Sequence, residues 1–552
     1  MRKKQTEGVC IYSCGRMFLC LSNINLEILY LNNLIFCLVI NIWADKRAFL
    51  HLIKNIMKLS LFFLFSILIS ISSHATNYYV STNGSNTNSG LSLGLSWATL
   101  QYASDHVVAG DCVLVANGTY VGCYIDVTGT AAKPIVFKAI GTNVVINQPN
   151  GTTNDGINVE NCDWIVIDGF RVINQPRTGI RVVKADNCVV RNNFCDNNAR
   201  WGILTGFAEN IIIEYNECSN SQAEHGIYFS NSADNPIIRY NKCHHNSNCG
   251  IHMNGDVSLG GDGIITNARV EGNIIYENGT GGGSGINCDG VSNSIILNNL
   301  LYANHASGIS LYQIDGGAAS TNNKVFNNTI INASNARWCL NITDSSTGNT
   351  VLNNILINQN TARGSITISA NSLTNFSSNN NIVVNKMSKD DGNTILNLAN
   401  WQSSGYDVNS LLAAVQTGIF VNPAGADFHL LSASQAIDNG SALVSSVVLK
   451  DMELNSRPQG AGYDMGCYEY MLPTSIPENF TDNDCTVFPN PATTTLMVTM
   501  NDERTLEIYN MTGQLLNTYR LSKGSHGIDI SHLASGLYLI RSGKAGKKLV
   551  VK

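Results

Sequence analysis

The sequence predicts an all-β protein whose main part is a right-handed single-stranded parallel β-helix. Two observations lead to this fold: a repeat of about 23 residues through the middle of the chain, and short segments within each repeat that alternate apolar with polar residues. The composition agrees, because 48 glycines against 10 prolines suit short strands joined by tight turns.

The dipeptide Gly-Ile marks each repeat. It recurs seven times with spacings of 23, 23, 24, 24, 35 and 23 residues, and such regularity indicates a solenoid. Several strands of about five residues per repeat favour a β-helix over a propeller, whose blades need about 40 residues. The glycines of this dipeptide are Gly156, Gly179, Gly202, Gly226, Gly250, Gly285 and Gly308.

An asparagine recurs near the middle of each repeat. We expect each copy to occupy the same turn, where a left-handed backbone and stacked side-chain amides are both favourable. The copies are Asn193, Asn216, Asn241, Asn273, Asn299, Asn328 and Asn354.

Three cysteines test this register. Cys195, Cys218 and Cys243 each lie two residues after the marked asparagine, and later repeats carry isoleucine or leucine there. We therefore predict a buried column of small core residues rather than metal ligands or a redox pair.

The amino terminus carries an export pattern. Met57 and Lys58 precede a long apolar run that ends in small residues at Ala75, which predicts a signal peptide over residues 57–75. Residues 1–56 are then an upstream segment outside the mature protein. The alternative is a genuine membrane anchor over residues 26–43.

Two columns of side chains are predicted to share the outward face of one sheet. These are the second and fourth residues after each glycine, since alternate residues of a strand face the same side. From the fourth repeat onward both columns are almost wholly polar or aromatic and contain no lysine, which predicts a functional groove; the alternative is a solvated face. The columns read Asn158, Arg181, Leu204, Tyr228, His252, Asn287, Ser310 and Glu160, Val183, Gly206, Ser230, Asn254, Asp289, Tyr312.

The groove predicts carbohydrate chemistry. Only 13% of residues are charged and the net charge is -6, so electrostatic capture of nucleic acid is not expected. A long polar groove with tyrosine rings fits an extended acidic polysaccharide, and a histidine acts as acid or base near neutral pH. The catalytic candidates are His252, Tyr312, Asp289 and Tyr228, and the substrate-binding candidates are Arg181, Asn254, Asn287, Ser310, His225 and His305.

The aspartates leave other chemistries open. Two carboxylates that flank a glycosidic bond would make the protein a hydrolase. Asp256, Asp262 and Asp315 could instead hold Ca²⁺, the one cofactor that the sequence suggests, which would neutralise a uronate and acidify its α-proton. Asp262, beside glycines, is equally compatible with a turn.

Several segments resemble a known superfamily. Residues 78–90, 96–100, 109–113 and 117–120 resemble the opening of secreted β-helix proteins related to pectate-lyase-like polysaccharide lyases, and Asp464-Met-Gly-Cys-Tyr-Glu-Tyr470 is similar to a closing segment found there. The resemblance implies a β-helix domain over residues 76–470. Many such lyases use a groove Lys or Arg as base together with Ca²⁺, whereas the His and Tyr pairing is closer to β-helix alginate epimerases, whose Asp-Pro-His motif is missing.

The last part of the chain resembles a second family. Val487-Phe-Pro-Asn-Pro491, Leu533-Ala-Ser-Gly-Leu-Tyr538 and the terminal Lys547-Lys-Leu-Val-Val-Lys552 are similar to the C-terminal sorting domain of the Bacteroidetes type IX (Por) secretion system. This resemblance implies a small β-sandwich over residues 485–552, a linker over residues 471–484, and export by the type IX machinery to the cell surface or medium.

The sequence therefore predicts a secreted, monomeric enzyme that cleaves a uronic-acid-containing polysaccharide by β-elimination, or that epimerises it. A glycoside hydrolase using groove aspartates and a non-catalytic carbohydrate-binding or adhesin solenoid are the alternatives.

Overall fold

The computed structural model describes residues 50–51, 53–58, 75–471, 485–510, 514–542 and 545–552. The predicted upstream segment and signal peptide fall largely on residues outside these ranges, and so does nearly all of the predicted linker. Within the described ranges, none of the helices has both the length and the apolar character needed to cross a membrane.

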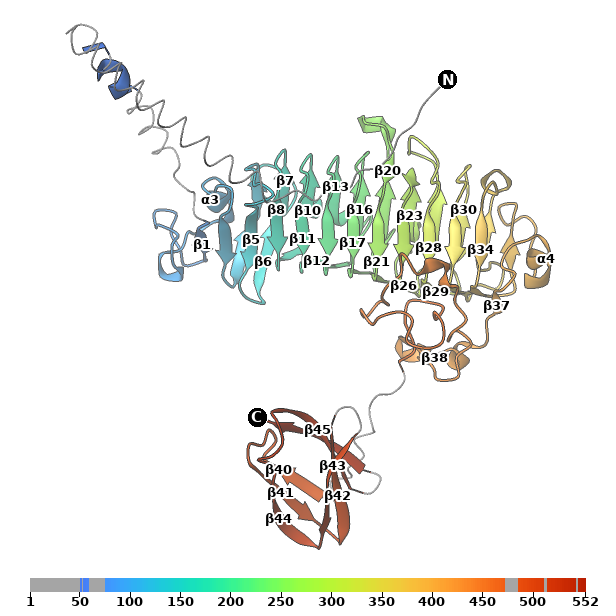
Figure 1. The fold of residues 1–552 in the computed structure, drawn as a ribbon. Helices are drawn as coiled ribbons and strands as arrows, with labels where there is room; N and C mark the ends of the chain where they lie inside the picture. The colour runs from blue at the N-terminus through green and yellow to red at the C-terminus, as the bar shows by residue number, and fades with distance from the viewer. Residues whose placement is uncertain (1–49, 52, 59–74, 472–484, 511–513, 543–544) are drawn as a thin grey trace, which may run out of the picture. The chain divides into compact units, whose positions relative to one another are not determined.

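The main part of the chain is a parallel β-helix, as the repeat predicts (Figure 1). Each coil gives one strand to each of three sheets, so strands that pair in a sheet are one coil apart in sequence. The first sheet has 12 strands in the described residues. They are β1 (Asn77–Val80), β2 (Cys112–Val115), β5 (Ile135–Ala139), β8 (Ile165–Asp168), β11 (Val189–Arg191), β14 (Ile212–Glu214), β17 (Ile237–Arg239), β21 (Arg269–Glu271), β25 (Ile295–Leu297), β28 (Lys324–Phe326), β31 (Thr350–Leu352) and β34 (Ser377–Asn379).

The second sheet, which carries the predicted groove, has 11 strands in the described residues. They are β4 (Cys123–Ile125), β7 (Ile157–Glu160), β10 (Thr178–Val183), β13 (Trp201–Gly206), β16 (Ile227–Ser230), β19 (Ile251–Asn254), β23 (Ser284–Asp289), β27 (Ser307–Tyr312), β30 (Leu340–Ile342), β33 (Ile366–Ile368) and β36 (Met387–Ser388).

The third sheet again has 12 strands in the described residues. They are β3 (Gly118–Val121), β6 (Val144–Gln148), β9 (Arg171–Ile173), β12 (Phe194–Asp196), β15 (Glu217–Ser219), β18 (Lys242–His244), β22 (Ile274–Tyr276), β26 (Leu300–Tyr302), β29 (Thr329–Asn332), β32 (Ile355–Asn358), β35 (Ile382–Val383) and β37 (Leu411–Leu412). A two-stranded sheet of β20 (Ile265–Thr266) and β24 (Val291–Ser292) lies in the loops that leave the second sheet.

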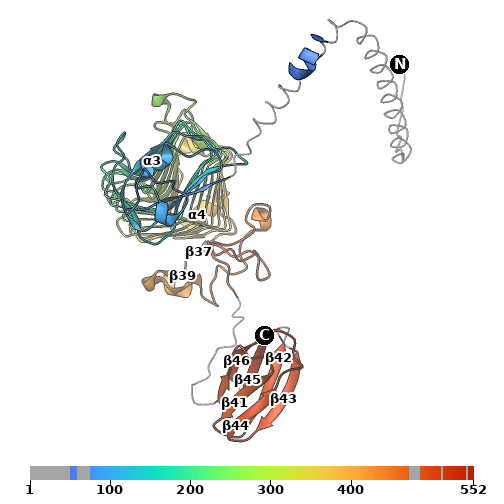
Figure 2. The same cartoon turned by 90° about the vertical axis from the view of Figure 1, so that its left-hand side faces the viewer.

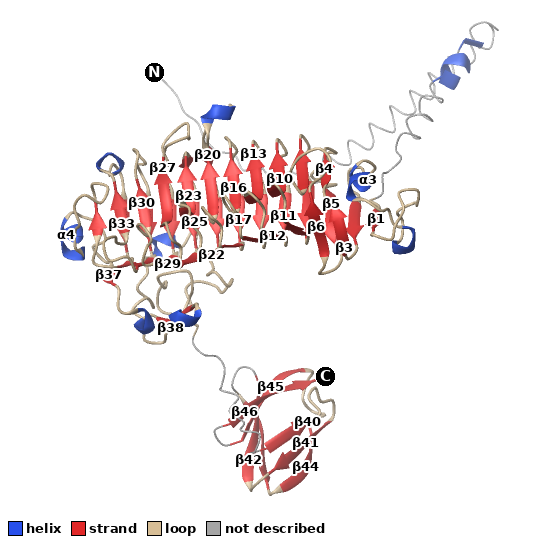
Figure 3. Cartoon of the chain, turned by 180° about the vertical axis from the view of Figure 1, so that it is seen from behind, coloured by secondary structure: helices blue, strands red, loops and turns tan. Residues whose placement is uncertain are grey.

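The coils, which Figure 2 shows end-on, enclose one hydrophobic core. Helices are short and lie at the ends and in the loops (Figure 3). Leu100 of α3 (Leu100–Ser104) and Trp401 of α4 (Leu398–Ser403) are buried in this core, one near each end of the coil stack. They shield the terminal coils, which have no further coil to pack on.

The predicted cysteine column is confirmed. Cys195 pairs in register with Cys218, which pairs with Cys243, and all three are fully buried. Their thiols are free, so among the described residues they serve as core packing without a disulfide.

The predicted asparagine stack is also confirmed, with one correction. The side-chain oxygen of each later marked asparagine accepts from both the backbone N–H and the side-chain amide of the preceding one, at 2.9 to 3.1 Å, as Asn299 accepts from Asn273 and Asn328 from Asn299. The left-handed backbone, however, belongs to the preceding residue, such as Tyr215 (φ 55°) and Tyr240 (φ 54°). The turn needs one residue with positive φ, and the asparagine after it is then free to point inward and bond along the stack.

An Asn299→Ala variant should lose roughly 2–3 kcal/mol of stability. Asn299 is fully buried, accepts from the backbone and side chain of Asn273, and donates to Val270 and Asn328. The alanine leaves those partners buried and unpaired. Denaturation with urea measures the loss, and the exposed Asn335→Ala serves as the control because it removes only a surface bond to His305.

A smaller region over residues 416–470 packs against the outside of the coils. Its β38 (Phe420–Asn422) and β39 (Asp427–Leu430) form an antiparallel pair. Phe420 and Phe428 pack with residues of the third sheet, and Val444 and Tyr463 pack with residues of the first sheet. The short helices of the described chain that complete the β-helix unit are η1 (Leu93–Leu95), η2 (Val257–Leu259), η3 (Ala370–Ser372), η4 (Gln416–Gly418), η5 (Pro423–Gly425) and η6 (Ala442–Val444).

The C-terminal residues form a small β-sandwich, as expected. A three-stranded and a four-stranded antiparallel sheet enclose their own hydrophobic core. The strands are β40 (Cys485–Phe488), β41 (Thr495–Met500), β44 (Gly524–Asp529) and β42 (Arg504–Asn510), β43 (Leu515–Leu521), β45 (Gly536–Ser542), β46 (Ala545–Val551).

Candidate functional site

The outward face of the second sheet brings most of the predicted site residues together. Parallel pairing places Tyr228, His252, Asn287 and Ser310 side by side on four successive strands. Asn254, Asp289 and Tyr312 form the neighbouring column in the same register. The inward residues between them, such as Ile251, are fully buried in the core. The alternation of apolar and polar residues thus fixes which side chains face outward.

His252 lies against a second histidine. Its Nδ1 is 3.0 Å from Nε2 of His225, and the Cys249 backbone N–H donates to Nδ1 of His225 at 3.2 Å. His225 must therefore carry its proton on Nε2, and it donates this proton to His252. Burial lowers the pKa of His225 to about 3 and that of His252 well below its usual value, so both rings are neutral near pH 7.

The nitrogens of His252 are consequently occupied or covered. Nδ1 accepts from His225, whereas Nε2 is buried without a hydrogen-bond partner in the described part of the chain. A base must reach the proton that it removes. The side chain is therefore better placed to hold its neighbours than to accept a proton from a polysaccharide in the groove.

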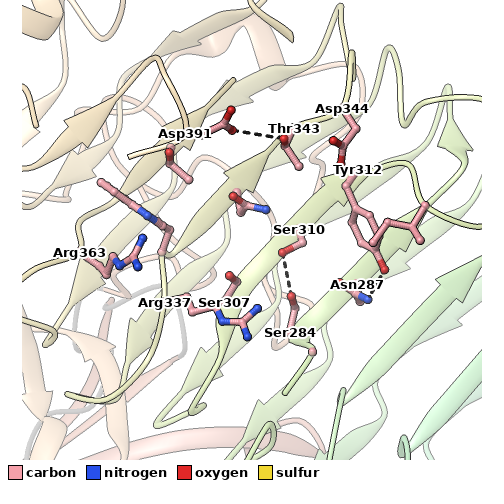
Figure 4. Close-up of a pocket in the computed structure, with 15 residues that line it drawn as sticks. Ser284, Asn287, Ser307, Ser310, Tyr312, Arg337, Thr343, Asp344, Arg363 and Asp391 are labelled. Atoms are coloured by element: carbon pink, nitrogen blue, oxygen red, sulfur yellow. Dashed lines mark hydrogen bonds between the residues drawn. The ribbon is translucent and has the colours of Figure 1, made fainter. Parts of the chain in front are cut away.

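A cavity of about 360 Å³ lies further along the same face, over β23, β27, β30 and β33 (Figure 4). Asn287 donates to the hydroxyl of Tyr312 at 2.7 Å, and the hydroxyls of Ser284 and Ser310 are 2.8 Å apart. The remaining polar lining comes from Ser307, Arg337, Asn341, Thr343, Asp344, Arg363, Thr367 and Asp391.

Tyr312 is poised to donate a proton. Its oxygen accepts from Asn287, so the hydroxyl hydrogen is not used in that bond. Burial, with the charge of Asp289 nearby, raises its pKa far above the usual value, so the phenol stays protonated. Tyr228 makes the equivalent bond to Asn254 at 3.1 Å, and burial raises its pKa to about 12.

Asp289 shapes the cavity wall. Its carboxylate accepts backbone N–H bonds from Ile314, Asp315 and Gly316 at 2.8 to 3.0 Å and is almost fully buried. These bonds fold the loop 313–317 over the edge of the sheet. With its oxygens so engaged, the carboxylate positions that loop and is not open to substrate.

The three predicted Ca²⁺ ligands occupy turns. Asp256 accepts from the Ser258 amide, Asp262 accepts from the Ile264 amide, and Asp315 lies 3.4 Å from the amide of Asn254. Over the described residues, the potential ligand atoms that gather in a group of three belong to His225, Cys249 and His252 instead. The aspartates thus offer Ca²⁺ no ready-made cage, and its involvement stays a prediction.

The two outlying candidates, Arg181 and His305, lie outside the main cavity. Arg181, three strands before His252, holds Glu160 at 2.6 Å and Asn158 at 2.9 Å through one guanidinium nitrogen. His305 bonds Asn335 and lines a second cavity of about 460 Å³ next to the glycines 279–282. Arg337 lines both cavities and so connects them.

The two arginines of the main cavity were not predicted from the sequence. Arg337 and Arg363 precede β30 and β33, in coils where no Gly-Ile dipeptide marks the strand. Strand pairing reveals the register instead, since Ser310 pairs with Asn341 and Asn341 with Thr367. The asparagine marks, which continue to Asn354, were the signal that could have extended the columns.

Two separate parts of the chain match known families. Residues 486–552 match the family described as a secretion system C-terminal sorting domain, and residues 104–283 match the family described as periplasmic copper-binding protein (NosD). The protein is a parallel β-helix protein with a C-terminal sorting domain. This domain indicates type IX secretion to the cell surface or extracellular space. Comparison with curated proteins gives no match.

Solved structures share the β-helix fold. The crystal structure of pectate lyase Pel9A aligns with a TM-score of 0.51 at 16% identity, covering 72% of this chain and 97% of that one. An alginate lyase from Paenibacillus sp. str. FPU-7 aligns with a TM-score of 0.40 at 18% identity, covering 53% of this chain and 95% of that one. A rhamnogalacturonan lyase aligns with a TM-score of 0.39 at 15% identity, covering 63% of this chain and 92% of that one. At such identities the pectate lyase likeness establishes the fold alone.

Proposed function

We propose that the protein is a polysaccharide lyase that cleaves a uronic-acid-containing polysaccharide by β-elimination. The observation that carries this proposal is the cavity in which Arg337 and Arg363 lie with the protonated Tyr312. A guanidinium binds a carboxylate through two parallel hydrogen bonds, which suits the uronate group. The cavity is part of a longer polar face, which suits a polymer.

The reaction needs a base that removes the α-proton of the uronate and an acid that protonates the leaving glycosidic oxygen. The arginines neutralise the uronate carboxylate, which makes the adjacent α-proton more acidic. Asp344, exposed beside Tyr312, takes that proton. The electron pair of the broken C–H bond forms the new double bond, the bond from the β-carbon to the glycosidic oxygen breaks, and Tyr312 protonates the leaving oxygen.

A hydrolase is the second candidate, because Asp344 and Asp391 both line this cavity. In that reaction one carboxyl group protonates the leaving oxygen and the other activates water or attacks the sugar. The two functions differ in product. A lyase leaves an unsaturated uronate end that absorbs in the ultraviolet, whereas a hydrolase leaves only new reducing ends.

The purified protein should therefore release products with ultraviolet absorbance from at least one uronate polymer, with pectate, alginate and rhamnogalacturonan as the first substrates. The control is the same polymer with its carboxylates reduced to alcohols, which cannot undergo this elimination and should remain intact. New reducing ends without ultraviolet absorbance would contradict the lyase and support the hydrolase. If the polymers bind but no product forms, the result would support a non-catalytic carbohydrate-binding solenoid.

A further inference from the structure

We propose that the corner of the coils between the third and the second sheet binds a neutral sugar branch of the polysaccharide, so that the preferred substrate is a branched uronate polymer. This inference rests on the proposed function, because it adds a second contact to the same polymer. The corner holds the cavity of about 460 Å³, a volume usual for ligand sites. Its lining comes from residues 279–282 before β23, 305–306 before β27, and 335 and 337 before β30.

The corner cavity runs beside the main cavity. Strands β23, β27 and β30 pair in register, so the turns that precede them stack along the coil axis, parallel to the face that holds the main cavity. Arg337 lines both cavities, and its backbone N–H donates to the carbonyl of Ala306 at 3.2 Å. Figure 4 shows Arg337 near Ser284 and Ser307, the first residues of β23 and β27. A polymer in the main cavity would therefore extend a substituent sideways over the corner.

The free polar groups of the corner cavity match sugar hydroxyls. Nδ1 of His305 donates to Oδ1 of Asn335 at 2.9 Å. In the neutral ring this leaves Nε2 of His305 as an acceptor, and it leaves the side-chain amide of Asn335 as a donor. Neither group has another partner in the described part of the chain. Because a hydroxyl both donates and accepts, a sugar with two neighbouring hydroxyls satisfies both groups at once.

The same pair disfavours an acidic sugar. A carboxylate placed here would face the lone pair of Nε2 of His305 without a hydrogen to donate. A hydroxyl supplies that hydrogen. The cavity therefore selects a neutral sugar, while Arg337 stays with the uronate of the main cavity.

Backbone without side chains forms one wall of the corner cavity. Gly279 and Gly282 have φ of 87° and 128°, which other residues rarely adopt. No atom lies within 4 Å of the place that a Cβ of Gly282 would take, so this wall is open to a ligand. A sugar ring can thus approach the main chain closely, opposite His305 and Asn335 on the following turns.

The test compares cleavage of a pectin that carries neutral galactan and arabinan branches with cleavage of the same pectin after galactanase and arabinanase have removed them. For the full-length protein we expect kcat/KM to be about 10-fold higher on the branched form, the effect of one or two hydrogen bonds between neutral groups. His305→Ala and Asn335→Ala should abolish this preference. His106→Ala removes an exposed histidine that bonds only the Tyr102 carbonyl, far from the corner, and as the control it should keep the wild-type preference.

The preference is a ratio measured on one preparation, so a partly unfolded variant does not alter it. An equal loss on both pectins in His305→Ala would place a backbone sugar in the corner cavity and overturn the proposal, as would a wild-type protein that prefers neither form. If neither pectin is cleaved, calorimetric binding of the branched and debranched fragments tests the inference separately from the proposed function. Tighter binding of the branched fragments by wild type but not by His305→Ala supports it, and equal binding overturns it.

Discussion

An Arg337→Gln variant is expected to cleave its uronate polymer with a kcat/KM about 10²- to 10³-fold below wild type, the range typical when one group that stabilises a developing negative charge is removed. As the α-proton leaves, negative charge accumulates on the uronate carboxylate. The Arg337 side chain lines the cavity in which we propose that this charge develops, and glutamine offers it only a neutral amide. Initial rates of ultraviolet absorbance over a range of polymer concentrations measure both constants.

The kinetic pattern separates two roles for Arg337. If it acts on the transition state, kcat and kcat/KM fall together, whereas a purely ground-state contact raises KM alone. Arg171→Gln is the charge-matched control, because Arg171 lies on the third sheet over the ring of Phe194 and should leave cleavage unchanged. An Arg337→Gln enzyme with wild-type kcat/KM would contradict the assignment of this cavity as the active site.

The fold was predictable because the repeat reports directly on geometry. A β-helix needs one inward apolar column per sheet and one turn of fixed shape per coil, so the same residue type returns at each coil. Ile251 and Cys218 occupy such columns, and Asn299 occupies the turn. The identity of the left-handed residue was less predictable, because tyrosine, glycine and asparagine all take that place.

For the site, the sequence predicts only which face of the sheet carries the functional side chains. Alternation tells which side chains point outward, and Tyr312 and Asn287 do meet there. It does not tell how deeply a residue is covered: His252 was expected to face the groove, but its nitrogens are enclosed because His225 and Cys249 stack beside it from positions outside the two columns. Nor does it reach loop residues such as Arg337, whose direction depends on how the chain enters the strand.

An Arg457→Met variant should lose about 3–5 kcal/mol of local stability, the usual result of removing one partner of a buried ion pair. Arg457 and Glu469 are 2.9 Å apart, and both side chains are 0% exposed. The guanidinium also donates to the carbonyls of Asp464 and Gly466 at 3.0 and 2.7 Å. Burial raises the pKa of the Glu469 carboxyl even with Arg457 beside it, which shows how costly an unpaired charge would be.

The loss is expected within the region over residues 416–470, which packs on the coils through its own small apolar contacts. Hydrogen exchange reports such local opening, and 3–5 kcal/mol corresponds to about two to four orders of magnitude in protection. Arg457→Met with Glu469→Gln should recover part of the loss, since glutamine carries no charge and can still accept from the amide of Asp464. Lys242→Met, which breaks the half-exposed pair with Glu217, should cost at most about 1 kcal/mol. Equal effects of Arg457→Met and Lys242→Met would mean that burial does not set the strength of these pairs, and the region would then be held by its apolar contacts alone.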